Sequence, residues 1–192
     1  PTASTVMDVK HLSLGQVGEQ PRRTGSFTTF GRFVAFTTGG GPAAQLTTID
    51  AAETDLKPVH LAVPMAEGQR PSGLEIVTPR KGSPWAFVFH GQPAGGTAPN
   101  QLSLIELDPN TDGRLDDAKV AVVLEVGKAL VNGHGGHHSV AFDADRRRAI
   151  FTNPGDGNLT VLTLKDRQVA AHLQIGGTPS KLIAVGGRAS DH

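Results

Sequence analysis

The sequence predicts an all-β protein, on the basis of three observations. Glycine (24 residues) and proline (13 residues) are frequent in a chain of 192 residues, and both interrupt regular helices. Short alternating or apolar runs, such as "SFTTF" and "NLTVLTL", recur between turn residues, as strands do. No extended window shows the three- and four-residue apolar spacing of an amphipathic helix. The length is sufficient for one sizeable domain with its own core.

An internal repeat organises these strands. Four similar segments recur along the chain: "KHLSLG" (10–15), "VHLAVP" (59–64), "VVLEVG" (122–127) and "AHLQIG" (171–176). Each is followed by a loop rich in glycine or proline and then by a short apolar strand; after the first three segments two more strands follow. Each unit therefore carries four strands, A to D, with a period of about 50 residues, which is typical of β-propeller blades.

The repeat also predicts the boundaries of the blades. We expect complete blades over 26–63, 72–125 and 138–175, a leading D strand over 5–14 and a trailing A strand over 180–185. A closed propeller needs at least about four blades. The chain is therefore expected to supply about three and a half four-stranded antiparallel blades of a larger ring, which another chain or a further segment completes.

The segment "VNGHGGHHSVAF" (131–142) is the strongest candidate for a metal site. It places three of the eight histidines of the chain within five positions, at the entrance to an innermost strand. Propellers gather their D-to-A and B-to-C loops at one mouth of the central channel, so other polar residues of such loops should converge there. The candidate ligands are Glu67, His90, His134, His137, His138 and Asp156.

Imidazole and carboxylate side chains are the ligands that a tetrahedral zinc site uses when cysteine is absent. His137 and His138 are consecutive in an extended run and point in opposite directions, so at most one of them should share a site with His134 and His90. The carboxylate would come from Asp156 or Glu67. The alternative is a polar turn in which glycines shape the loop and one histidine caps the strand without a metal.

A second candidate is a calcium loop in "DPNTDGRLD" (108–116). Four of its residues match the first, third, fifth and ninth positions of an acidic Ca²⁺ loop: Asp108, Asn110, Asp112 and Asp116. Lys119 stands where an EF-hand has a bidentate glutamate, and the same residue types build tight turns without an ion. This segment is the C-to-D turn of the middle blade and should lie at the end opposite the histidines.

Composition and motifs exclude several function classes. Eighteen basic and eighteen acidic residues balance each other, which argues against a nucleic-acid partner, and no apolar run is long enough for membrane insertion. No nucleophile elbow, phosphate-binding loop or thiol is present. His11, His60 and His172 recur at one repeat position in separate blades, so we expect them to be structural.

The stretch "FDADRRRAIFTN…GNLTVLTLKDRQVAAHLQIGGTPSKLIAV" resembles the repeats of the YncE-like, YVTN-type bacterial β-propellers. With "GHGGHH" and no cysteine, the chain looks like the AztD family of periplasmic zinc chaperones. The resemblance implies an extracytoplasmic, non-enzymatic propeller that passes zinc to the periplasmic zinc-binding protein of an ABC importer. Two alternatives stay open: a propeller enzyme, such as a lactonase or a metal-dependent oxidase with Glu67 as base, or an interaction scaffold without metal.

Overall fold

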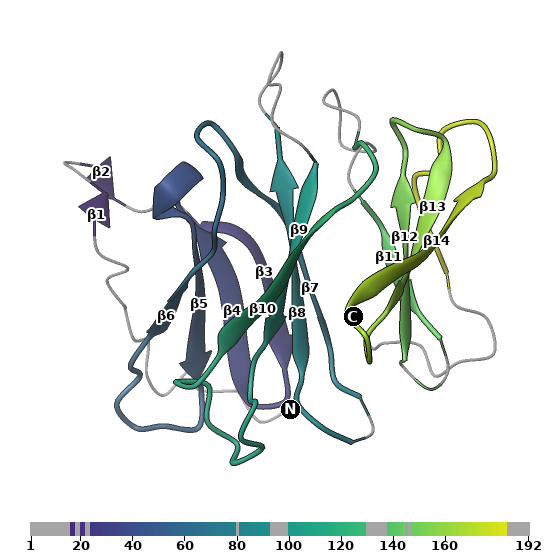
Figure 1. Ribbon diagram of the computed structural model, residues 1–192. Coiled ribbons are helices and arrows are strands. Elements are labelled where there is room, and N and C mark those ends of the chain that lie inside the picture. Colours follow the sequence, from purple (N-terminus) through teal and green to yellow (C-terminus); the bar gives the residue numbers. More distant parts are fainter. Residues whose placement is uncertain are drawn as a thin grey trace, which may run out of the picture.

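The computed structural model confirms an all-β chain built of three four-stranded antiparallel sheets (Figure 1). It describes residues 16–17, 20–21, 24–79, 81–92, 100–129, 138–143, 145 and 147–183. Blade 1 consists of β3 (Thr24–Phe30), β4 (Phe33–Thr38), β5 (Gln45–Asp50) and β6 (Val59–Ala62). Blade 2 consists of β7 (Arg70–Val77), β8 (Trp85–Gly91), β9 (Gln101–Glu106) and β10 (Lys119–Glu125). Blade 3 consists of β11 (Val140–Phe142), β12 (Arg148–Asn153), β13 (Asn158–Thr163) and β14 (Gln168–Gln174).

In every blade, each strand pairs antiparallel with the next strand along the chain. Gly31, with a φ of +55°, lets Phe30 pair directly with Phe33 across the tight turn between β3 and β4. Two small elements lie outside the blades: the short pair β1 (Gln16–Val17) and β2 (Gln20–Pro21), and the 3-10 turn η1 (Gly41–Ala43).

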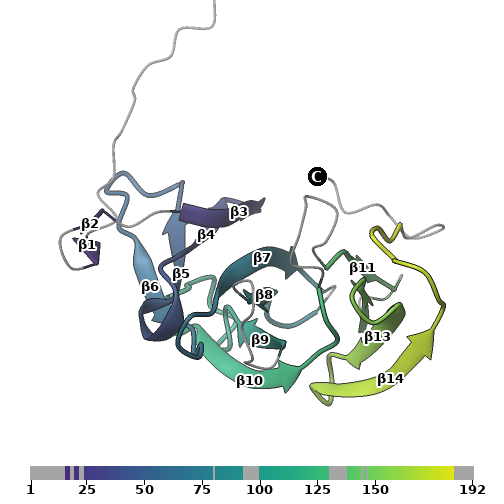
Figure 2. The same ribbon diagram turned by 90° about the horizontal axis from the view of Figure 1, so that it is seen from above.

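The three blades fan out in an arc when viewed from above (Figure 2). The first strands of the blades, β3, β7 and β11, lie on the inner side of the arc, and the last strands, β6, β10 and β14, lie on its outer side. This is the arrangement of consecutive blades around a propeller axis, and the sequence-based prediction of four-stranded antiparallel blades is confirmed.

The core consists of two seams between neighbouring blades. Seam 1, between blades 1 and 2, is aliphatic, and its buried members include Ala35, Leu46, Leu74, Val88 and Ile105. Seam 2, between blades 2 and 3, is aromatic, and its buried members include Phe87, Phe89, Leu102, Phe151 and Leu162. Successive residues of a strand point to opposite faces, so adjacent residues of β8 serve different seams.

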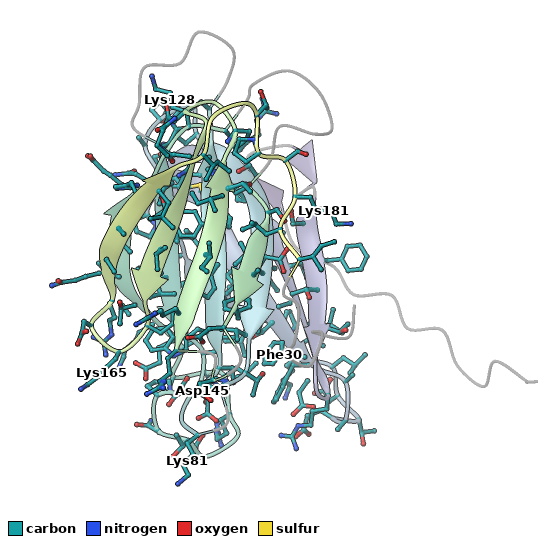
Figure 3. The ribbon with its side chains drawn as sticks, turned by 90° about the vertical axis from the view of Figure 1, so that its right-hand side faces the viewer. Phe30, Lys81, Lys128, Asp145, Lys165 and Lys181 are labelled. Carbon is teal, nitrogen blue, oxygen red and sulfur yellow. The ribbon has the colours of Figure 1, made fainter. Side chains whose placement is uncertain are left out.

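The connections gather at two ends of the blades. The D-to-A connections and B-to-C loops form the upper end in Figure 1, and the A-to-B and C-to-D turns form the lower end. Figure 3 shows this division, with Lys128 at the upper end and Lys81, Asp145 and Lys165 at the lower end. Asp145 forms an exposed ion pair with Arg147 (2.8 Å), as expected for a solvated hairpin tip.

Several expected features lie outside the described residues: the leading strand over 5–14, His11, His134 and His137. The described part of the trailing strand, 180–183, belongs to no strand. The Leu182 backbone N–H donates to Ser139 Oγ (3.1 Å), beside the start of β11. Over the described residues, the structure contains no helix with the length and hydropathy needed to cross a membrane.

Candidate metal site at the upper end

His138 stands at the entrance to β11, at the upper end of seam 2. Its Nδ1 lies 2.6 Å from the carbonyl oxygen of Thr152. Because a carbonyl only accepts, Nδ1 carries the proton in this contact. A histidine that binds a metal through one ring nitrogen commonly donates the N–H of its other ring nitrogen to a backbone carbonyl in this way.

Aromatic side chains set the orientation of the His138 ring. It stacks on the ring of Phe89, with centroids 4.6 Å apart and planes inclined by 20°, and Phe151 meets it edge-on at 6.2 Å. The Ser139 backbone N–H donates to Thr152 Oγ1 (2.8 Å) and pins the following residue. The imidazole is therefore half-buried and held by two blades at once.

His138 directly follows segment 130–137. The turn after β12 also holds the chain just before this segment. The Lys128 backbone N–H donates to Asp156 Oδ2 (2.7 Å), and the Gly155 N–H donates to the Lys128 carbonyl (2.8 Å). A side chain at Gly127 would overlap the side chain of Asn153, so glycine is needed at this contact. The end of β12 thus anchors the chain at residue 138, and the turn that follows β12 anchors it at residue 128.

His90 has a different environment. It is 2% exposed and belongs to β8, whereas the sequence suggested that it enters a loop. Its Nε2 lies 2.8 Å from Ser103 Oγ, and its Nδ1 has no hydrogen-bond partner among the described residues. Burial lowers the pKa of His90 to about 4, so the ring is neutral near pH 7.

The structure does not bring His90 and His138 together. Phe89, which carries the His138 ring, faces seam 2, so the next residue, His90, faces seam 1 with Val88. Glu67 is exposed on the connection between blades 1 and 2, and Asp156 is exposed beside Lys128. No three of these described candidates place ligand atoms within 4.8 Å of one another. The complete ligand set stays a prediction, since it includes His134 and His137.

The acidic turn of the middle blade does gather carboxylates. Asp108, Asp112 and Asp117 offer oxygens within 4.8 Å of one another. The calcium-loop prediction made from the sequence named Asp116 rather than Asp117. Asp116 instead accepts a hydrogen bond from Arg114 Nε (3.0 Å), and this guanidinium holds the pKa of Asp116 below its usual range.

Hydrogen bonds within the turn explain most of this cluster without an ion. The two carboxylate oxygens of Asp108 accept the backbone N–H groups of Asp112 and Gly113, each at 3.0 Å. The backbone N–H of Asn110 donates to Asp117 Oδ2 (3.1 Å). Aspartate carboxylates that accept backbone N–H groups are typical of tight turns, so the calcium loop stays a prediction.

A cleft of about 260 Å³ lies beside this turn, between blades 1 and 2 at the lower end. Its charged lining is partly paired internally, because Arg32 bridges Asp50 (2.9 Å) and Arg114 bridges Asp116. The cleft is therefore at the end of the blades opposite His138, and it shares no lining residue with the histidine candidates.

His60 and His172 occupy equivalent positions in separate blades. His60 Nδ1 lies 2.9 Å from Thr47 Oγ1, and His172 Nδ1 lies 3.0 Å from Thr160 Oγ1. Each imidazole thus bonds the hydroxyl directly across from it on the neighbouring strand. These two histidines act as cross-strand partners within their own blades.

Fold and site together define a segment of a β-propeller with an anchored histidine at its upper end. No family model and no curated protein matches the chain. Several solved structures are similar to it. Hydrazine synthase of Kuenenia stuttgartiensis matches with a TM-score of 0.49 and 18% identity, over 79% of this chain and 49% of that one.

Two further similar structures are of AztD from Citrobacter koseri, the family that the sequence resembles. Apo AztD matches with a TM-score of 0.33 and 16% identity, over 86% of this chain and 51% of that one. A second AztD structure matches with a TM-score of 0.31 and 13% identity, over 88% and 51%. The chain therefore spans about half the length of the structures that it matches. The functional argument rests on the residues of this chain and not on these likenesses.

Proposed function

We propose that this chain is part of an extracytoplasmic, zinc-binding β-propeller that delivers zinc to the solute-binding protein of an ABC importer. The observation that carries the proposal is the anchoring of His138. Its Nδ1–H donates to the Thr152 carbonyl, the orienting contact that metal-binding histidines commonly make, and it directly follows the segment that contains His134 and His137.

The chemistry of delivery supports the same residues. Neutral imidazoles bind Zn²⁺ without the very tight hold of several thiolates, and the chain has no cysteine. Asp156, which lies in the anchoring turn and accepts the Lys128 backbone N–H, is a described candidate for the carboxylate ligand. His90 serves blade packing in this proposal, because it is buried on the other face of blade 2.

Transfer is tested with the zinc-loaded chain and the metal-free solute-binding protein. We expect zinc to pass to the binding protein faster than it passes to a chelator of equal affinity, which would show direct handover. The His134→Ala/His138→Ala double variant should not acquire zinc to transfer. His172→Ala is the matched control, because it removes an exposed imidazole of blade 3 that bonds Thr160, and it should transfer normally. Equal rates to chelator and binding protein would contradict delivery, though not zinc binding.

A further inference from the structure

The turn after β12 binds both backbone polar groups of Lys128. The Lys128 N–H donates to Asp156 Oδ2 (2.7 Å), and the Lys128 carbonyl accepts the Gly155 N–H (2.8 Å). Lys128 follows β10 of blade 2, whereas the turn belongs to blade 3. The Asp156 carboxylate therefore satisfies a backbone group as a neighbouring strand would, and it ties the exit of blade 2 to blade 3.

The backbone packs closely around this contact. A Cβ atom on Gly155 would lie 2.8 Å from Lys128 Cβ and 3.0 Å from the Ala129 carbonyl oxygen. A Cβ atom on Gly127 would overlap the side chain of Asn153, which is fully buried. Glycine at these two positions lets the two stretches approach each other, and Lys128 is held in place by close packing as well as by hydrogen bonds.

The same stretch of blade 3 holds the chain on the other side of segment 130–137. His138 Nδ1 donates to the Thr152 carbonyl (2.6 Å), just before the turn that contains Asp156. The described residues on both sides of the segment are therefore fixed to one short stretch of chain, 152–156. Fixing both ends of a segment lowers the conformational entropy that the segment loses when it binds a ligand.

We propose that Asp156 is a positioning residue of the zinc site, which acts by holding Lys128 and is not itself a zinc ligand. This inference rests on the proposed function and decides between the two roles open to this carboxylate. Its Oδ2 is engaged in a short, charge-assisted hydrogen bond. Among the described residues, Asp156 belongs to no group of three whose ligand atoms lie within 4.8 Å of one another.

Zinc titration of three variants separates the two roles. Asp156→Asn keeps an acceptor oxygen for the Lys128 N–H but removes the carboxylate, so it should bind zinc as wild type does. Asp156→Ala removes the acceptor and should weaken zinc binding about 5-fold, the loss expected for one hydrogen bond. Gly155→Ala keeps the carboxylate but displaces Lys128, and it should weaken binding as well. Asp166→Ala, in the exposed turn after β13, is the control and should change nothing.

Hydrogen exchange of the Lys128 amide in the metal-free chain tests the hold without zinc. Asp156→Ala should speed this exchange about 5-fold and Asp156→Asn should not, while the melting temperature shows that each variant is folded. Zinc binding that Asp156→Asn and Asp156→Ala weaken equally would identify a ligand and overturn the proposal. So would zinc binding that no substitution weakens, or exchange that Asp156→Ala leaves unchanged. A wild type that binds no zinc would contradict the proposed function, and with it a role of Asp156 in a zinc site, even where exchange shows that the hold exists.

Discussion

The two seams of the molecule end differently at the upper end of the blades. Seam 1 is aliphatic and encloses His90 completely, whereas seam 2 is aromatic and carries His138 at its rim, half-buried against Phe89. His90 belongs to blade 2 and faces seam 1, whereas His138 belongs to blade 3 and packs on the opposite face of blade 2. The comparison shows that burial, and not the number of histidines near the mouth, separates a packing residue from a candidate ligand.

The largest expected effects on stability come from truncating the central side chains of each seam. Phe89→Ala should lower the free energy of unfolding by about 3–5 kcal/mol and also weaken zinc binding, because it removes the ring under His138. Val88→Ala, on the other face of β8, should cost about 2 kcal/mol and leave zinc binding unchanged. Denaturant unfolding and zinc titration measure both effects. Equal losses of zinc affinity in the two variants would show that general destabilisation, and not seam 2, controls the site.

A second prediction uses the titration of His90. Its pKa is lowered from 6.5 to about 4 in the folded state, so the unfolded state takes up the proton first as the pH falls. This residue should therefore remove about 3 kcal/mol of stability between pH 6.5 and about pH 4.

The control for this titration comes from the repeat itself. Asn153 occupies the equivalent position of blade 3, since His90 pairs with Gln101 as Asn153 pairs with Asn158. His90→Asn should thus keep a polar residue at this position and lose this part of the pH dependence. Urea unfolding of both proteins across this range gives the difference. Identical pH profiles would mean that the ring is not enclosed as described.

The smallest expected effect concerns the anchor of His138. Thr152→Val removes the acceptor of the Ser139 N–H and should cost about 1 kcal/mol of stability. It should also weaken zinc binding slightly, because Ser139 beside His138 loses its acceptor, whereas the Thr152 carbonyl that accepts from His138 Nδ1 is kept. Thr48→Val, at a buried threonine of seam 1, is the matched control and should not affect zinc. If both variants bind zinc equally well, the Thr152 hydroxyl does not position His138.

Sequence reasoning predicted the strand order and the four-stranded blades because alternation and turn residues are local properties. It could not assign His90, because the face that a residue of β8 presents depends on which neighbouring blade packs there. It also chose Asp116 instead of Asp117, since the spacing of carboxylates does not reveal that Arg114 binds Asp116. The role of Thr152 was missed because its backbone carbonyl makes the contact with His138, and the residue type does not reveal this.

The most direct test of the account is the zinc affinity of wild type and of the His134→Ala/His138→Ala variant, measured by competition with a chelator and by metal content. The account predicts that wild type binds one zinc ion per chain and that the double variant binds at least about 100-fold more weakly, a loss of about 2.7 kcal/mol. His90→Asn should keep the wild-type affinity. Zinc binding that survives the double substitution, or that is lost with His90→Asn alone, would contradict the assignment of the site to the glycine–histidine segment.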